Sequence, residues 1–312
     1  MGPLTENKIV LITRRTRLDE LVARFNTLSQ ARFYVEHLGA DFSDYLKEHE
    51  TYRASVSQVE AILKEQGRLQ TVDRSFLTNF IFGGKDTVVV LGQDGLVANT
   101  LKYLSGQQVV GVNPDPKRWD GVLLPFVASD LAKIIPDVFE TRRPIKEVTM
   151  AQAILNNGQS LYAVNDLFVG VRSHTSARYK IKAGRTEEQH SSSGIIISTG
   201  LGSTGWFKSL MAGAVEIASK VSGTKVKMSI ESSFSWDSKY LYYTVREPFP
   251  SKNSSASLVF GKVTAKHPLE LMSQMAENGR IFSDGIESDF LEFNSGTQAK
   301  ITIADKVGCL IV

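Results

Sequence analysis

One stretch in the first half of the chain restricts the fold more than any other. Between residues 87 and 112 a strand, a glycine turn, a helix and a second strand follow one another. Residues 87–91 form an apolar run typical of a buried strand, the turn 92–95 has the sequence GQDG, and residues 96–104 and 108–112 fit a helix and another strand. Such a unit forms a parallel sheet with a right-handed crossover, and ligands bind beyond the carboxyl ends of its strands.

The pattern changes near the middle of the chain. Up to Arg143 strand-like and helix-like segments alternate, whereas the rest consists mainly of short strands. Pro144 cannot continue a helix and marks the change. The strands expected after it span residues 161–164, 167–171, 178–181, 194–199, 226–230, 241–245, 257–263, 281–283 and 299–303. We predict an α/β domain over residues 1–143 and a β-rich domain over 144–312, the latter with one helix over 204–220.

Within the first domain the apolar pattern also predicts individual elements. The expected strands cover residues 8–13, 69–72, 87–91 and 108–112. Helical spacing predicts a helix over 18–25, one or two short helices over 33–38 and 42–48, and a separate amphipathic helix that starts near Val56 and stops at Gly67.

Composition excludes several classes of protein. The chain has 36 basic and 33 acidic residues, and the resulting charge of +3 is too small to indicate a nucleic-acid partner. Its single cysteine, Cys309, excludes an internal disulfide and fits a reducing compartment. No apolar run approaches eighteen residues, and no secretory signal pattern is present. We therefore expect a cytoplasmic protein with neither a membrane nor a nucleic acid as partner.

The turn at 92–95 is the first element that suggests chemistry. It lies where a buried strand ends and a helix begins, so backbone N–H groups and the positive end of the helix dipole suit a phosphate. The carboxylate of Asp94 would repel a bare phosphate unless it orients Mg²⁺ or accepts a proton from an attacking hydroxyl. The alternative is a tight turn that uses Asp and Gly only for their backbone conformations.

Two further polar elements lie in the β-rich half. Asn165 and Asp166 separate two apolar strand segments, which fits either a hairpin turn or a pair of acceptors for vicinal ribose hydroxyls. Residues 191–206 run from a buried strand through a Gly/Ser/Thr loop into a helix. A simple capped turn explains Ser203 but not three glycines within six residues.

Taken in order, the three elements resemble the NAD kinase family, which has a GGDG turn, an NE pair and a GDG…STPTGSTAY segment. The chain is most similar to the mitochondrial-type NAD kinases. That likeness lies in TRRTR at 13–17, GVNPDP at 111–116, SSG at 192–194, TGLGS at 199–203 and SDG at 283–285. The resemblance implies an N-terminal Rossmann-like α/β domain and a C-terminal β-sandwich-like domain.

The same resemblance implies a function and a set of site residues. The activity would be an ATP-dependent NAD kinase that phosphorylates the adenosine 2′-hydroxyl of NAD or NADH, with Mg²⁺ carried by ATP, in a homodimer. Asp94 would act as base on that hydroxyl, and Gly92 and Gly95 would leave room for phosphates. The residues implied at NAD are Asn165, Asp166, Ser193, Thr199, Thr204, Gly205 and Trp206. Arg14, Arg15 and Arg17 are candidates for neutralising the donor phosphates, or else form a solvated basic loop.

Departures from the family pattern keep other functions open. Gln93 and Leu96 replace a glycine and a threonine at the turn, and Asp166 and Ser193 replace a glutamate and an aspartate. A non-catalytic NAD(P)-binding regulator, or a lipid or sugar kinase with the same turn, is the alternative. The histidines lack metal-binding spacing, no metal ligand can be assigned directly, and His174 and His190 are expected to be exposed.

Overall fold

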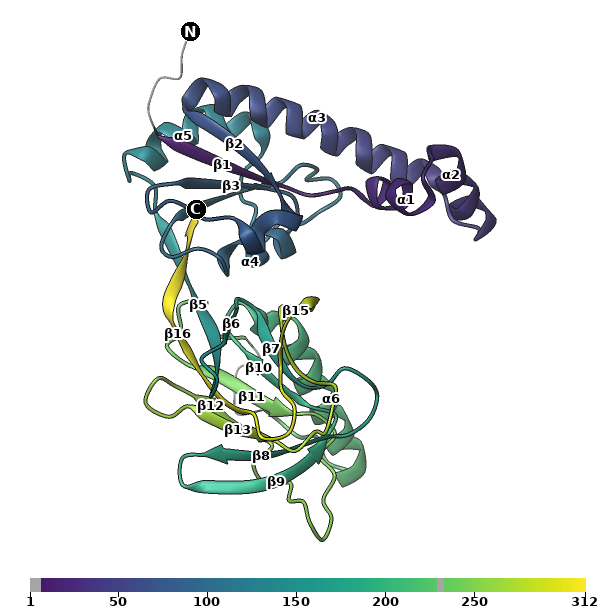
Figure 1. Cartoon of the computed structure of the whole chain (residues 1–312), viewed down its shortest axis with the longest axis vertical. Coiled ribbons are helices and arrows are strands. Elements are labelled where there is room, and N and C mark those ends of the chain that lie inside the picture. The colour runs from purple at the N-terminus through teal and green to yellow at the C-terminus, as the bar shows by residue number, and fades with distance from the viewer. Residues whose placement is uncertain (1–6, 229–232) are drawn as a thin grey trace. The chain divides into compact units, whose positions relative to one another are not determined.

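The computed structural model describes residues 7–228 and 233–312, and the chain divides into two compact units (Figure 1). Unit 1 contains the chain up to Lys146 together with Gly308–Val312, and unit 2 contains Glu147–Val307. The sequence pattern places the boundary three residues earlier and does not reveal that the last five residues return to unit 1.

Unit 1 is built on a parallel sheet with the order β2-β1-β3-β4. Its strands are β1 (Lys8–Thr13), β2 (Arg68–Asp73), β3 (Thr87–Leu91) and β4 (Gln108–Val112). The end of β16 (Gln298–Ile311) pairs in parallel with β4 through Cys309 and Leu310. The helices are α1 (Arg17–Phe25), α2 (Leu28–His37), α3 (Phe42–Gln66), α4 (Asp94–Leu101) and α5 (Leu131–Phe139), with 3₁₀ turns at Arg74–Asn79 and Ala128–Asp130. The strand, glycine turn, helix and strand expected between 87 and 112 are confirmed.

Helices cover both faces of this sheet, which explains why its inner strands are continuous apolar runs. α3 and α5 pack on one face and α4 lies on the other (Figure 1). All five residues of β3 are buried. The core on the α3 side joins Leu11 of β1 and Val89 of β3 to Val59 of α3 and Ile135 of α5.

The two helices expected over 42–48 and 56–66 are one 25-residue helix, α3, so that expectation was wrong. Glu48 is the last residue of the first expected helix and Tyr52 lies in the supposed gap, and both are buried. Both side chains make polar contacts, which a search for apolar spacing does not detect.

Unit 2 is a sandwich of two antiparallel layers. One has the order β12-β11-β10-β7-β14-β15, and the other contains β16-β13-β8-β9 with β5 and β6 beside β16. The strands that the sequence predicted are β6 (Ser160–Ala163), β7 (Asp166–Val171), β8 (Ala177–Ala183), β10 (Ile195–Ser198), β11 (Leu241–Val245), β12 (Phe260–Val263), β14 (Gly279–Ser283) and β16. Those it missed are β5 (Ile145–Leu155), β9 (Thr186–Ser192), β13 (Leu269–Ser273) and β15 (Ile286–Glu292).

Between the layers lies an apolar core that includes Val169, Tyr179, Ile197 and Phe293. A 3₁₀ turn (Gly202–Thr204) leads into α6 (Trp206–Ser222), the one α-helix among the described residues of this unit, as expected. The strand expected over 226–230 does not form at 226–228, and residues 229 and 230 lie outside the described part of the chain. Among the residues that the structure describes, no helix has the length and apolar character needed to cross a membrane.

Candidate functional site

Asp94 stands at the first position of α4, directly beyond the carboxyl end of β3. The N–H groups of Leu123 and Val122 donate to its two carboxylate oxygens at 2.7 and 3.2 Å. These donors belong to the loop after β4, so the carboxylate is oriented by the neighbouring strand's loop. One side chain thus joins two strand ends at the edge of the sheet where α/β folds bind ligands.

The two glycines of the turn lie in different surroundings. Gly95 has open space where a side chain would begin. At Gly92 a Cβ atom would lie 2.7 Å from Cδ2 of Leu96, and the Gly92 N–H donates to the Val112 carbonyl at 3.2 Å. Leu96, which replaces a threonine of the family pattern, therefore fills the space beside Gly92, and only Gly95 faces open space.

Tyr52 of α3 ties the arginine loop after β1 to the glycine turn after β3. The Arg14 N–H donates to its hydroxyl at 2.9 Å, and that hydroxyl donates to the Leu91 carbonyl at 3.0 Å. Burial raises the pKa of Tyr52 to about 12, so its hydroxyl keeps its proton at neutral pH. No sequence pattern marks Tyr52 as a functional residue, because a tyrosine in a helix is most often a packing residue.

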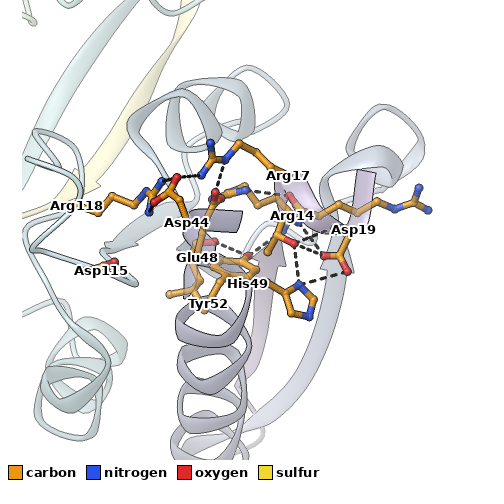
Figure 2. Close-up of polar contacts among 12 residues, drawn as sticks. Arg14, Arg17, Asp19, Asp44, Glu48, His49, Tyr52, Asp115 and Arg118 are labelled. Atoms are coloured by element: carbon orange, nitrogen blue, oxygen red, sulfur yellow. Dashed lines mark hydrogen bonds and ion pairs between the residues drawn. The ribbon is translucent and has the colours of Figure 1, made fainter. Parts of the chain in front are cut away.

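The three predicted phosphate ligands after β1 differ in their partners (Figure 2). Arg14 pairs with Glu48 at 3.0 Å, and Arg17 pairs with Glu48 and, at 2.7 Å, with Asp44. Arg15 is exposed and forms no ion pair within residues 7–228 and 233–312. Two of the three arginines therefore have carboxylate partners from α3.

In unit 2, Asn165 and Asp166 do not form the hairpin turn that was the simpler interpretation. β6 pairs with β5, whereas β7 pairs with β10 and β14, so the Asn165 position carries the chain from one layer to the other. The Asp284 carboxylate accepts hydrogen bonds from the N–H groups of Val164 at 3.1 Å, Asn165 at 2.7 Å and Asp166 at 3.2 Å. Asp284 thus fixes the backbone of this crossover.

The Ser-Asp-Gly triplet around Asp284 is part of the family resemblance, which implies no role for it. The Asp284 backbone has a positive φ of 53°, and Gly285 follows at 70°. That pair of left-handed residues turns the chain so that the side chain reaches back to the crossover.

Asp166 and Trp206, two of the predicted NAD ligands, line one cavity of about 280 Å³. The rings of Phe168 and Trp206 stack at 5.8 Å with 18° between their planes, and Phe282 lies 6.1 Å beyond Phe168. The Arg246 guanidinium lies 5.5 Å from the Trp206 ring centroid. The cavity is also lined by Arg172 and Glu287, and aromatic walls with such polar groups suit a flat, polar ring system such as a nucleobase.

Asp166 is 9% exposed, and burial together with the nearby Asp284 raises its pKa from 3.8 to about 7. An acid whose pKa is raised by folding stabilises the fold below its unfolded pKa and loses that contribution as the pH rises through about 7. We expect the unfolding free energy of the wild type to fall between pH 5 and pH 8, by up to about 3 kcal/mol. Urea unfolding at both pH values measures it.

The Asp166→Asn variant should lose most of this pH dependence. Glu277→Gln, at an exposed position of the same unit, is the matched control and should keep the wild-type slope. Equal slopes in the wild type and Asp166→Asn would contradict a buried, titrating carboxyl at this position.

Thr199 anchors the crossover rather than lining the cavity. It is fully buried, its hydroxyl donates to the Val164 carbonyl at 2.5 Å, and its N–H donates to the Asn165 carbonyl at 2.9 Å. A Cβ atom at Gly202 would lie 2.1 Å from the same Asn165 carbonyl oxygen. At Gly200 a Cβ atom would lie 1.9 Å from the Ser235 carbonyl oxygen, so close backbone approach explains two of the three glycines of this loop.

The other predicted NAD-binding residues do not line the aromatic cavity. Ser193, Thr204 and Gly205 are all exposed, and Asn165 is half-buried beside the cavity residue Asp166. The structure thus brings Asp166 and Trp206 together and leaves these four residues outside that cavity.

The surroundings of His190 differ from those that the sequence predicts. His190 was expected to be exposed, but its side chain is fully buried and its Nε2 lies 2.9 Å from Glu188, so that expectation was wrong. The alternating pattern of β9 turns it inward. In the part of the chain that the structure describes, no three His, Cys, Asp or Glu side chains gather as metal ligands.

Comparison with known proteins gives matches in structure alone. No family model and no curated protein matches the sequence. The yeast NADH kinase complexed with NADH is 16% identical, with a TM-score of 0.59 over 99% of this chain and 84% of that one. An NAD kinase from Archaeoglobus fulgidus in complex with ATP is 12% identical, with a TM-score of 0.53 over 98% of this chain and 93% of that one. The chain therefore has the two-domain fold of NAD kinases, an α/β domain followed by a β-sandwich-like domain.

Proposed function

We propose that this chain is an ATP-dependent NAD kinase of the mitochondrial type, which transfers a phosphoryl group to the adenosine 2′-hydroxyl of NAD or NADH. The observation that carries the proposal is Asp94, held at a strand end by two backbone N–H groups in a fold shared with NAD(H) kinases. The homodimer and the cytoplasmic location remain predictions from the sequence.

In this mechanism Asp94 accepts the proton of the 2′-hydroxyl as that oxygen attacks the γ-phosphorus of the donor. The bond from γ-phosphorus to the bridging oxygen breaks, and ADP leaves. Gly95 leaves space for phosphate oxygens, and the exposed Arg15 supplies charge to them. Phosphoryl transfer depends mainly on such positioning and charge neutralisation.

Unit 2 binds the dinucleotide. Asp166, when ionised, accepts hydrogen bonds from ribose hydroxyls, and Phe168 and Trp206 pack against a base. Thr199 holds the backbone of the Asn165 crossover and acts on the substrate only through it. We propose that Asn165, Ser193, Thr204 and Gly205 contact the dinucleotide outside the aromatic cavity.

Mg²⁺ enters this proposal only as a ligand of the ATP phosphates, where it would neutralise charge. Because the described residues offer no cluster of three ligands, no side chain is assigned to the metal. The proton transfer to Asp94 does not involve the metal.

One observation favours a non-catalytic NAD(P)-binding protein as the second candidate: Leu96 closes the space beside Gly92. Incubation with ATP, Mg²⁺ and NAD or NADH, with NADP read through a specific dehydrogenase, separates the two candidates. Turnover supports the kinase, and NAD binding without turnover supports the regulator.

A lipid kinase with the same turn would need an exposed apolar surface for its acceptor, and two exposed apolar side chains of α6 lie far from the aromatic cavity. Ile217 and Val221 are 67% and 84% exposed. They lie roughly 16 and 22 Å along the helix from Trp206 and its cavity, at 1.5 Å per residue.

A Trp206→Ala variant is expected to raise the KM for NAD about tenfold and to leave kcat within about threefold, because it removes a stacking surface and no reacting group. Steady-state kinetics measure both constants. Phe249→Ala removes a 64% exposed aromatic side chain that lines a different cavity of unit 2 and should leave both constants unchanged. An unchanged KM in Trp206→Ala would remove the tryptophan from the proposed NAD site.

A further inference from the structure

We propose that Arg14, Arg17 and Arg118 form a polyphosphate-binding site and that the Asp44 carboxylate is its replaceable counterion. The assignment of this site to the phosphate donor rests on the proposed function. The binding of a polyphosphate is a separate property, which can be measured without NAD.

Arg118 comes from the loop after β4 and was not selected from the sequence. Its two terminal nitrogens donate to both oxygens of Asp44, at 2.7 and 2.6 Å, and Arg17 donates to Asp44 at 2.7 Å (Figure 2). A carboxylate held in this way presents oxygens to two guanidinium groups at once. A terminal phosphate has the same geometry and more charge, and planar guanidinium groups bind phosphate and carboxylate in the same two-point manner.

The order of strands in the sheet puts the loops that carry these arginines at the same edge as the turn that carries Asp94. Arg14 and Arg17 follow β1, Arg118 follows β4, and β3 lies between these two strands. β3 leads into the turn that carries Asp94. All three carboxyl ends lie at one edge of the parallel sheet, the edge at which α/β folds bind ligands.

The two carboxylates of the cluster differ in burial, and this gives them different roles. The Glu48 side chain is 4% exposed and pairs with Arg14 and Arg17. Removing a buried partner of this kind leaves uncompensated charge, so Glu48 is a permanent anchor. The Asp44 side chain is 44% exposed, so a competing anion in solvent can reach its ion pairs with Arg17 and Arg118 and take its place.

Charge and protonation both favour exchange by an anion. Arg14, Arg17 and Arg118, set against the Asp44 and Glu48 carboxylates, leave an excess of positive charge. The hydrogen bonds from Arg118 and Arg17 hold the pKa of Asp44 well below its usual range. Asp44 therefore stays ionised at neutral pH, and a competing polyanion rather than a proton displaces it.

Calorimetric titration of the full chain with inorganic tripolyphosphate, without NAD, tests this assignment. Asp44→Asn removes the competing charge and should tighten binding about tenfold, whereas Arg118→Ala should weaken it about tenfold or more. Arg118→Lys keeps the charge but loses the two-point contact and should fall between. The matched control is Asp137→Asn, which removes the partner of Arg142 elsewhere in unit 1 and should leave binding within about twofold.

Thermal unfolding of each variant shows whether it is folded, and the Arg118→Lys result stands in if Arg118→Ala does not fold. Unchanged or weaker binding in Asp44→Asn overturns the proposal, and so does the absence of binding in both the wild type and Asp44→Asn. If tripolyphosphate binding follows the expected order but no NADP forms, the polyphosphate site stands and the kinase assignment fails.

Discussion

An Asp94→Asn variant is expected to form NADP about a hundredfold to ten-thousandfold more slowly than the wild type, which is the usual range for loss of a general base. The amide cannot accept the proton of the 2′-hydroxyl. It keeps one oxygen for the Leu123 or the Val122 N–H but gives up the other contact. Steady-state kinetics should therefore show a large fall in kcat with a small change in the KM for NAD.

Asp130→Asn is the matched control for this experiment. The Asp130 carboxylate accepts a hydrogen bond from the Val127 N–H at 2.9 Å at the start of α5. The control makes the same carboxylate-to-amide change at an aspartate that binds backbone, and it should retain turnover. If both variants retain wild-type turnover, Asp94 is not the base; if both lose it, the effect is structural.

The second large effect is expected at Gly202. A methyl group there would lie 2.1 Å from the Asn165 carbonyl oxygen, and both atoms are in a buried backbone contact. Something in the crossover must move, so Gly202→Ala should destabilise the chain by about 3 kcal/mol, at the upper end of overpacking effects. Because Asp166 follows Asn165 directly, NAD binding should be lost as well. Urea unfolding and NAD titration measure the two effects.

Gly213→Ala provides the control in the following helix. Gly213 lies within α6 with open space around it, so alanine there should stabilise the chain by up to about 1 kcal/mol through helix propensity. NAD binding should not change. A Gly202→Ala variant that unfolds like the wild type would show that the loop does not hold the crossover as closely as described.

The sequence identified the inner strands of the unit 1 sheet well, because they are buried on both faces and consist of apolar runs. β1, β3 and β4 have the bounds that the pattern predicted. β9 was missed because its sequence, TEEQHSS, is polar at nearly every position. Its register with β8 forms through backbone pairing that side-chain polarity does not reveal.

The candidate site was predicted in part. Asp94, Asp166 and Trp206 stand out in sequence because a carboxylate in a glycine turn and a polar pair between strands break the local pattern. Tyr52 and Asp284 were missed because their partners lie far along the chain: the Tyr52 hydroxyl contacts the Leu91 carbonyl, and Asp284 contacts the Asn165 N–H, 119 residues away. Contacts of such separation depend on the tertiary fold and leave no local spacing to detect.

The most direct measurement is the position of the phosphate on the product. The chain is incubated with ATP, Mg²⁺ and NAD, and the purified dinucleotide is examined by ³¹P NMR. We predict a new phosphomonoester on the adenosine 2′-oxygen, formed by the wild type and by Asp130→Asn and strongly reduced in Asp94→Asn. Unmodified NAD after incubation with a chain that binds both ATP and NAD would contradict the proposed kinase.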